Sequence, residues 1–434
     1  MTDEMRTFRF TAFPDSKNQN NNLQQILDEA SILPEYSIAH IKLLRGVYSG
    51  QFFFDGNKIH AGTSGVSVLV EGSGIGKTVI SGSLAASEIL SDGLKRGTFR
   101  TYTAFFSGPR VELRKLTIEN TSGLPPPEGI GEKAMQGIAL YAAAEKMICK
   151  KIELSGHQDT LFLAPLPAAE REKGGFRGPG EFAPRKPTLQ LYEKCIVSGT
   201  VDFVFGGAAA LFRKCKFVVR NPAQSVPAAL ASETAQSVQE TQAAHGAHGA
   251  SVQDATPGVQ AQGVTPIQAS KTEKKYYVAA PCADSPAAEN DSSTGFFFKD
   301  CTFSVERETP IERKTPIVHK TMLFQNRIGP VEAARPSSTA DEALTSALES
   351  QVFIARPWRP YGRCFLFNCR IESGFSKELW HIWNNDEDKK TAGFYICGKR
   401  FEKNALKPKD WGQELSESEK LSMISKIETM LTNI

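Results

Sequence analysis

The sequence has no apolar run approaching 18 residues, almost no net charge and no cysteines in CxxC spacing. The first absence excludes a membrane-spanning helix, which needs about 20 predominantly apolar residues. A net charge of +3 over 434 residues gives no electrostatic reason to expect a nucleic-acid partner. The hydrophobic content of 40% is enough for a sizeable core.

The N-terminus lacks the features of a secretory signal peptide. Its first ten residues, MTDEMRTFRF, carry two acids and no apolar segment. We therefore expect a cytoplasmic protein, with secretion by an unrecognised route as the alternative.

Disulfide bonds are not expected either. Six of the eight cysteines lie within or beside alternating apolar runs, and thiols stay reduced in the cytoplasm. We predict that these six are small core residues in strands: Cys149, Cys195, Cys215, Cys301, Cys364 and Cys369.

A glycine-rich stretch, VEGSGIGKTVISGS at residues 70–83, raises the question of nucleotide binding. A phosphate-cradling loop requires GxxxxGK[ST], but position 71, where its first glycine would stand, is Glu71. The residues after Lys77 are β-branched and then broken by Ser81 and Gly82, which is typical of a strand and a turn. We therefore predict a turn between two strands and no nucleotide.

Six segments share one pattern: an alternating apolar run, a polar and mostly basic residue, a cysteine or aliphatic residue, and then a further apolar residue. One step of the pattern is 20 residues, about one coil of a parallel β-solenoid, and the longer steps contain stretches that would bulge from the turns. The pattern predicts an all-β fold, a right-handed parallel β-helix. The equivalent inward positions are Leu116, Ile152, Cys195, Cys215, Cys301 and Cys369.

We expect one domain over 1–434, with a helix near each end that caps or covers the solenoid. The first helix would follow Asn22 as its N-cap, and the C-terminal segment, 411–434, begins with a capping box of Ser416 and Glu419. The apolar faces of the two helices would be Leu23, Ile26, Leu27 and Ala30, and Leu421, Ile424, Ile427 and Leu431.

Three inserts interrupt the coils. The first, 163–188, is rich in Pro, Gly and charge, and the third, 307–351, is a polar connection. The second, 221–271, is of low complexity, and we predict disorder because it has too few large apolar residues to form a core.

Polar residues with strand-like surroundings occur in four short runs. Asp202 stands among valines and phenylalanines, where a carboxylate is costly to bury unless it is paired. Taken singly, Asp202 could be an acid on the outward face of a strand, and Asp159 could cap a turn. Gln136 and Arg356 alone would be ordinary surface residues. The runs are MQGIAL with Gln136, SGHQDTLF with Gln158 and Asp159, GTVDFVFGGAA with Asp202, and ARPW with Arg356 and Trp358.

Together the four runs resemble, in order, the QAVAL, GYQDTLY, GTVDFIFGNA and LGRPW signatures of the pectin methylesterases (pectinesterases), in particular those of bacterial type. The segments LTIENTSG, YYVAAP, STGFFFKDCTF and LWHIWNN are similar to further parts of that family. The resemblance implies a parallel β-helix that hydrolyses methyl esters of (oligo)galacturonides to carboxylate and methanol. It also implies a monomer without cofactor or metal, whose partner is a methyl-esterified oligogalacturonide or pectin rather than nucleic acid, nucleotide or membrane.

The resemblance also assigns roles to residues. It implies that Asp202 is the nucleophile, that Asp159 is the general acid and then the general base, and that Arg356 keeps Asp202 ionised. Gln136 and Gln158 would donate to the oxyanion. Trp358, Phe205 and Phe162 would bind the substrate.

Residue types alone are consistent with this chemistry. Without the 163–188 insert, the 43 residues from Asp159 to Asp202 shrink to roughly one coil, and adjacent coils lie about 4.8 Å apart. Two carboxyls that close cannot both ionise easily, so one of them keeps its proton.

The sequence departs from the family pattern at a few positions, none of which carries a catalytic group. Gly50 replaces the Glu of an early GxYxE signature, which puts the outer end of the groove and the substrate length in doubt. The other departures are His157 for Tyr, the loss of an Asn at Gly207–Ala208, and Ile354–Ala355 for Leu-Gly.

Other functions on the same scaffold stay open. A glycosidase would also use paired carboxyls, but the Asp-Asp and Gly-His-Gly signatures of polygalacturonase-like β-helices are missing. The alternatives are a non-catalytic carbohydrate-binding β-helix, against which the retained Asp, Gln and Arg residues argue, and an esterase or thioesterase of changed substrate.

Overall fold

The computed structural model describes residues 6–57, 65–123, 136–220, 275–286, 294–306, 351–401, 406 and 408–432. All of them belong to one compact unit, Met1–Asn221 with Lys275–Ile434. A second unit, Pro222–Lys274, lies outside the described residues, as does nearly all of the predicted insert 307–351.

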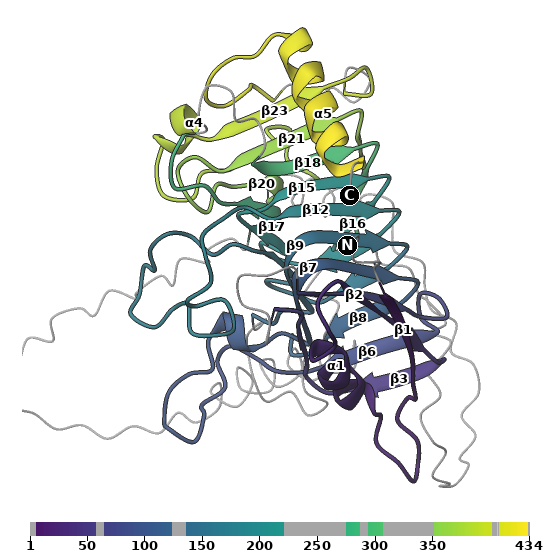
Figure 1. The fold of residues 1–434 in the computed structure, drawn as a ribbon. Coiled ribbons are helices and arrows are strands. Elements are labelled where there is room, and N and C mark those ends of the chain that lie inside the picture. Colours follow the sequence, from purple (N-terminus) through teal and green to yellow (C-terminus); the bar gives the residue numbers. More distant parts are fainter. Residues whose placement is uncertain are drawn as a thin grey trace, which may run out of the picture. The chain divides into compact units, whose positions relative to one another are not determined.

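The described chain winds into coils whose strands stack in three parallel rows. Figure 1 shows the strands of the first row, from β7 to β23, one above the other in chain order. Leu189 of β12 pairs with Ala209 of β15, so this coil has the expected 20 residues. The predicted parallel β-helix is confirmed.

The first row pairs ten strands. They are β1 (Arg6–Ala12), β2 (Ser37–Leu43), β5 (Val66–Glu71), β7 (Ala104–Arg114), β9 (Leu140–Lys150), β12 (Leu189–Glu193), β15 (Ala209–Arg213), β18 (Gly295–Lys299), β21 (Arg363–Phe367) and β23 (Gly393–Cys397).

The second row is a sheet of eight strands. They are β3 (Gly46–Ser49), β6 (Thr78–Gly82), β8 (Thr117–Asn120), β10 (Glu153–Ser155), β13 (Ile196–Gly199), β16 (Lys216–Val219), β19 (Thr302–Val305) and β22 (Arg370–Ile371).

The third row, which carries the candidate site, joins the first row through the long strands β7 and β9. Besides the first halves of those strands it contains β4 (Phe52–Asp55), β11 (Leu161–Leu163), β14 (Val204–Gly206), β17 (Tyr276–Pro281) and β20 (Val352–Ala355).

The corner between the first and second rows is built in the same way in six coils. At each corner one residue other than glycine has a positive φ between 50° and 56°, and its backbone N–H donates to a carbonyl of the next coil, as Lys194 does to Arg213 at 3.0 Å. This ladder bond fixes a backbone conformation that costs an L-residue roughly 1–2 kcal/mol. The six residues are Lys115, Lys151, Lys194, Lys214, Asp300 and Asn368.

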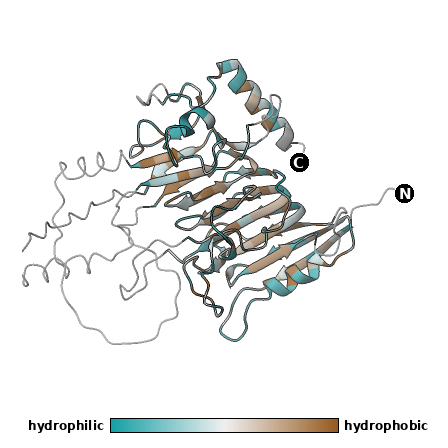
Figure 2. Ribbon diagram, turned by 90° about the vertical axis from the view of Figure 1, so that its left-hand side faces the viewer, coloured by the Kyte–Doolittle hydropathy of each residue, from teal (hydrophilic) through white to brown (hydrophobic). Residues whose placement is uncertain are grey.

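The residue after each of these corners points into the core. All six predicted inward positions are buried, which confirms the pattern: Leu116, Ile152, Cys195, Cys215, Cys301 and Cys369. Their apolar neighbours give the strands the brown colour of Figure 2.

The cysteines are reduced core thiols, as predicted. All eight are free and buried, and thiols such as that of Cys215 donate to backbone carbonyls of the coil, in this case Tyr192 at 3.3 Å. A thiol is small enough to fill the crowded corner and still finds a hydrogen-bond acceptor there.

The glycine-rich stretch is a turn between β5 and β6, as predicted. Gly76 has φ of 68° and its N–H donates to Thr117 Oγ1 of the next coil. Because a strand follows Lys77, no helix N-terminus faces this loop, and the geometry of a phosphate-cradling loop is absent.

The N-terminal helix α1 (Leu23–Ser31) closes the core with its predicted apolar face, since Leu23, Ile26, Leu27 and Ala30 are buried. Asn22 occupies the N-cap position, but its side chain does not cap the helix. Its Oδ1 accepts from the N–H of Phe13 at 2.7 Å instead, because the chain preceding the helix needs that acceptor.

The C-terminal helix α5 (Glu417–Thr432) begins with the predicted capping box: Ser416 N–H donates to Glu419 Oε2 at 2.7 Å, and Glu419 N–H to Ser416 Oγ at 3.3 Å. Leu421 does not join the apolar face and is 49% exposed. Lys420 takes the inward position of the first turn, where it pairs with Asp410 at 2.9 Å.

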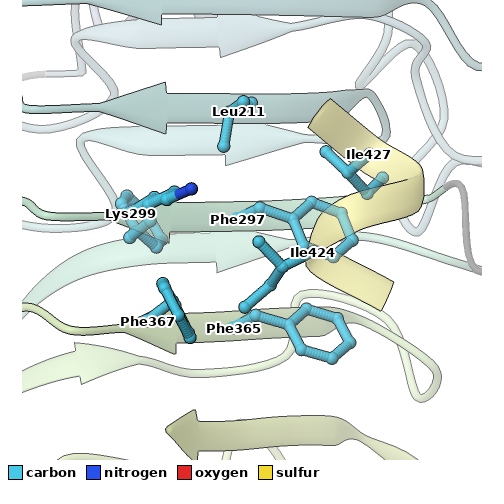
Figure 3. A pocket seen from close by; sticks show the side chains of 8 residues that line it. Leu211, Phe297, Lys299, Phe365, Phe367, Ile424 and Ile427 are labelled. Carbon is cyan, nitrogen blue, oxygen red and sulfur yellow. The ribbon is translucent and has the colours of Figure 1, made fainter. Parts of the chain in front are cut away.

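Helix α5 lies along the side of the first row rather than over an end of the coils. Ile424 and Ile427 point at Phe297 and Phe365 of that row (Figure 3). The predicted cover is therefore lateral, because the outward face of these strands is itself apolar. The described residues also include a 3-10 turn at Thr98–Arg100 and a short helix α4 (Asp388–Thr391), and none of their helices has the length and apolarity to cross a bilayer.

Candidate active site

Two buried acids occupy equivalent positions in adjacent coils, at the corner between the second and third rows. Leu161 pairs with Val204, and Asp159 and Asp202 each stand two residues before those partners. The backbone N–H of Asp159 donates to Val201 at 3.1 Å. Both acids have a positive φ, 65° and 49°, so the backbone turns at each of them and the expected proximity of the two carboxyls is realised.

The two glutamines of the prediction lie on neighbouring coils beside the acids. Gln136 and Gln158 form an isolated parallel bridge, and Gly137 N–H donates to the carbonyl of Gln158 at 3.1 Å. Both side chains are partly exposed. Gln136 thus lies one coil from Asp159 on the side away from Asp202, and Gln158 lies in the coil of Asp159 itself.

Arg356 reaches Asp202 from two coils further along the row. Its Nε lies 2.9 Å from Oδ1 of Asp202 and its Nη2 lies 2.6 Å from Oδ2, a two-pronged ion pair. The strand register places Ala280 between Phe205 and Arg356. This small side chain leaves room for the long arginine side chain to reach back over the intervening coil.

An aromatic clamp, formed by Tyr277 and Trp383, holds the guanidinium of Arg356. Its central carbon lies 3.9 Å from the centroid of the Tyr277 ring and 4.0 Å from that of Trp383. Such stacking stabilises a guanidinium and fixes its plane. Neither residue has a role predicted from the sequence, although the segments YYVAAP and LWHIWNN, which resemble the family, contain them.

A histidine stands behind the clamp. His381 Nδ1 lies 3.3 Å from the hydroxyl of Tyr277, and its Nε2 lies 2.9 Å from Nζ of Lys275. Burial lowers the pKa of His381, and the charges of Lys275 and Arg356 lower it further. The imidazole is therefore neutral at pH 7, so it adds no positive charge beside the arginine.

The two acids differ in electrostatic surroundings. Burial raises the pKa of Asp159 well above its usual range, and the charge of Asp202 raises it further, against a partial opposing effect of Arg356. Burial also raises the pKa of Asp202, but the hydrogen bonds and charge of Arg356 lower it again, so its shift is smaller. Asp202 therefore ionises at lower pH than Asp159.

Arg356 keeps its charge in this setting. Burial lowers its pKa, but the hydrogen bonds and charge of Asp202 more than offset that effect, so the pKa is raised overall. The expected partnership of Arg356 with Asp202 is thus present, but burial of Asp202 more than offsets the lowering by Arg356, so the pKa of this carboxyl is raised overall.

The three aromatic residues expected to bind substrate are not equally accessible. Trp358 is partly exposed and meets Phe205 edge-on, with ring centroids 5.7 Å apart. Phe205 is 4% exposed and Phe162 is fully buried. Phe99, from the 3-10 turn, packs edge-on against Phe162 at 5.0 Å. The binding roles of these residues stay predictions.

Gly50 belongs to the same corner as the two acids, but in the coil of β4. It has φ of 144° and its N–H donates to Ser81 at 2.9 Å. A glutamate would be strained in this backbone region, which only glycine adopts freely.

A model of the family described as Pectinesterase matches residues 14–166 and 185–284, more than half of the chain. The break in the match falls inside the insert 163–188, and the match ends before Arg356 and Trp358. The positions of Arg356 beside Asp202 and of Trp358 beside Phe205 therefore rest on the geometry.

Similar proteins of known kind were also found. A putative pectinesterase/pectinesterase inhibitor of Arabidopsis thaliana is 29% identical over 232 residues, which cover 53% of this chain and 38% of that relative. Seven further relatives from plants are likewise covered over well under half of their length.

Two solved structures share the fold. A pectin methylesterase from carrot has a TM-score of 0.54 at 15% identity, covering 95% of this chain and 89% of its own. A pectin methylesterase crystallised in complex with a hexasaccharide has a TM-score of 0.53 at 16% identity, covering 97% and 96%.

Proposed function

Because the chain belongs to the pectinesterase family, we propose that it hydrolyses methyl esters of galacturonides, releasing methanol and leaving a carboxylate. Besides membership of the family, one structural observation supports this reaction. Two buried acids are stacked in adjacent coils, and within the described part of the chain only Asp202 is paired with an arginine. This arrangement provides one ionised carboxylate and one protonated carboxyl in the same place.

In the first half of the proposed reaction, a carboxylate oxygen of Asp202 attacks the ester carbonyl carbon. The side-chain amides of Gln136 and Gln158 donate to the oxyanion that forms, a contribution worth about 3 kcal/mol per donor in other hydrolases. Asp159 gives its proton to the methoxy oxygen, methanol leaves, and an acyl-enzyme anhydride remains on Asp202.

The second half restores the enzyme. Asp159, now a carboxylate, takes a proton from water, whose oxygen attacks the acyl carbon of the intermediate. The bond to Asp202 breaks, Asp202 is again a carboxylate held by Arg356, and the galacturonide leaves with a free acid. Each residue ends in its starting state, and no cofactor enters the balance.

The clamp of Arg356 by Tyr277 and Trp383 supports the charge of Asp202 as it attacks in the first half and as it is released in the second. A glycosidase would have no use for donors aimed at an oxyanion, since its transition state resembles an oxocarbenium ion. The cytoplasmic location, the monomeric state and the bacterial subtype expected from the sequence stay predictions.

Methanol release from a methyl-esterified galacturonan tests the proposal. We expect turnover by the wild-type protein without a rise in reducing ends, which separates ester from glycosidic cleavage. A folded protein that releases no methanol from either polymeric or oligomeric galacturonide esters would overturn the proposal and favour the carbohydrate-binding alternative.

A further inference from the structure

A ladder of aromatic side chains runs along the outward face of the third row to the coil of Asp202. The strand registers align Phe53, Phe105, Tyr141, Phe162 and Phe205. Neighbouring ring centroids lie 4.7, 5.0, 4.6 and 5.0 Å apart in that order. Flat rings at this spacing would stack on successive sugars if they were open to solvent.

The ladder is covered beside the two acids. Phe99 packs edge-on against Phe162 at 5.0 Å and lies 6.2 Å from Phe205. Phe176, from the insert 163–188, packs edge-on against Phe99 at 5.8 Å and is itself buried. The outward rings at the Asp159 end of the site are therefore the floor of a closed apolar cluster.

The insert is attached to two further coils of the row, those of β17 and β20. Ala168 N–H donates to Asp284 at 2.7 Å, Arg171 to the carbonyl of Trp358 at 3.2 Å, and Arg359 to the carbonyl of Ala169 at 2.9 Å. Asp284 and Arg359 also form an ion pair at 3.4 Å. These bonds hold the insert over the ladder from the side of Trp358.

The rest of the insert is held by hydrogen bonds within it and by close packing against the aromatic cluster. Arg185 donates to four backbone carbonyls of its own insert, at 2.7 to 3.1 Å. A Cβ added at Gly178 would lie 2.7 Å from the carbonyl oxygen of Phe99, and one at Gly180 would collide with the hydroxyl of Tyr141. The loop thus packs with backbone directly against the cluster.

The solvent-accessible aromatic side chains of the site lie on the same side of the two acids as Arg356. Trp358 and Trp383 are partly exposed, and Arg171 lies exposed with its guanidinium carbon 5.7 Å from the Trp383 ring. Exposed rings flanked by guanidinium groups suit a sugar acid, whose carboxylate pairs with the cations while its ring stacks.

We propose that the insert 163–188 and the turn at Phe99 wall off one end of the substrate site, so that the enzyme acts on short methylated oligogalacturonides of about two to four sugars. The inference rests on the proposed function, since it assigns a chain length to the same reaction. A polymer would have to continue over the covered ladder beyond the reacting ester, where no open surface receives it.

Removing the cover tests the proposal. Thr188 Oγ1 donates to the carbonyl of Ala164 at 2.6 Å, so the two ends of the insert are close enough for residues 167–186 to be replaced by two glycines. A point variant, Phe176→Ser, loosens the cover without shortening the chain. Phe182→Ser is its matched control, because Phe182 belongs to the same insert and is 91% exposed.

The readout is kcat/KM per ester on a methylated trigalacturonide divided by that on high-methyl pectin. We expect a ratio of at least 1 for the wild type and for Phe182→Ser, and a ratio roughly tenfold lower for the deletion and for Phe176→Ser, as the polymer gains subsites. A wild type that strongly prefers pectin, or a ratio unchanged in folded Phe176→Ser, would overturn the proposal.

A binding measurement keeps this test separate from the test of the reaction. Quenching of tryptophan fluorescence by de-esterified trigalacturonate and by polygalacturonate needs no turnover. We expect wild-type protein to bind the trimer at least as tightly as the polymer, and Phe176→Ser to show a reduced preference for the trimer. This result would support closure of one end of the site by the insert even if no ester is cleaved. If wild type and Phe176→Ser show the same preference between trimer and polymer, or if neither sugar binds, the result counts against the proposal that the insert closes one end of the site.

Discussion

Lys194 and Asp202 stand eight residues apart in one coil and share an unusual backbone conformation, with φ of 55° and 49°. Both lie at corners where the chain leaves one row of strands for the next. Lys194 is exposed, whereas Asp202 is 4% exposed and paired with Arg356. The same backbone turn is thus used once to close a coil and once to present a buried acid.

The comparison teaches how to tell a structural corner from a functional one. At the first corner six coils use lysine, aspartate or asparagine, and the ladder hydrogen bond fixes the backbone whatever the side chain is. At the second corner the conformation coincides with a buried charge, which costs several kcal/mol unless it is paired. Backbone strain combined with a buried, partnered acid is the feature that marks a site of chemistry.

The largest effect is expected from Asp202→Asn, set against Lys194→Asn at the structural corner. The amide is nearly isosteric with the carboxylate but cannot act as a nucleophile, so methanol release should fall by at least about a thousandfold. Lys194→Asn should stay within twofold of wild type. Both should keep a wild-type far-UV circular dichroism spectrum, and Asp202→Asn activity within tenfold of wild type would remove Asp202 from the nucleophile role.

A smaller loss is expected when the clamp of Arg356 is opened. In Trp383→Leu the guanidinium loses one stacked ring, so it holds the Asp202 carboxylate less firmly and the pKa of that acid rises. We expect kcat/KM to fall by about 10- to 100-fold, with the acidic limb of its pH profile moved to higher pH, and with partial recovery in Trp383→Phe. A uniform loss at every pH would indicate a structural role only.

Replacing Asp159 by Asn should raise the stability of the folded protein at neutral pH. Its folded pKa is raised by burial, so the folded state binds more protons than the unfolded state, and stability falls as pH rises through the interval from the unfolded to the folded pKa. Asp159→Asn removes this loss, and we expect a gain on the order of 1–3 kcal/mol at pH 7.

Urea unfolding of Asp159→Asn and wild type across pH checks that prediction. The two proteins should converge below about pH 3, where Asp159 is protonated in both the folded and the unfolded state. A variant that is less stable than wild type at pH 7 would show that the folded state holds Asp159 ionised.

The smallest change is expected from exhaustive chelation. The proposed reaction uses carboxylates and amides, so EDTA should leave turnover unchanged. If activity were lost and a divalent ion restored it, the buried acids would be metal ligands, and the contrast between the two corners would need a different explanation.

The fold could be predicted because it repeats locally. Six coils place a polar residue with positive φ before an inward cysteine or aliphatic residue, and this pattern can be read from single segments such as those around Cys195 and Cys215. The side of the solenoid that α5 covers could not be predicted, because it depends on outward rings such as Phe297 and Phe365 in separate coils. The exposure of Leu421 follows from the ion pair that turns Lys420 inward.

The candidate site was predictable only in part, because some of its contacts join residues from separate segments of the chain. Asp159, Asp202 and the glutamines stand in short runs with recognisable neighbours. The structure brings them to three successive coils, and Arg356 reaches Asp202 from two coils further along. The clamp unites Tyr277, Arg356 and Trp383 from three separate segments, and no periodicity in the sequence connects them. The cover over Phe162 also depends on a contact between Phe99 and Phe176 that only folding creates.

Infrared spectroscopy of the protonated carboxyl group tests the central claim most directly, namely that Asp159 holds the proton and Asp202 the charge. At pH 7 the wild type should show the C=O band of a buried protonated carboxyl, and the band should persist in Asp202→Asn, because burial is the largest cause of the raised pKa of Asp159. It should disappear in Asp159→Asn. A band that is absent from wild type, or that vanishes in Asp202→Asn and persists in Asp159→Asn, would contradict the assignment of the two acids.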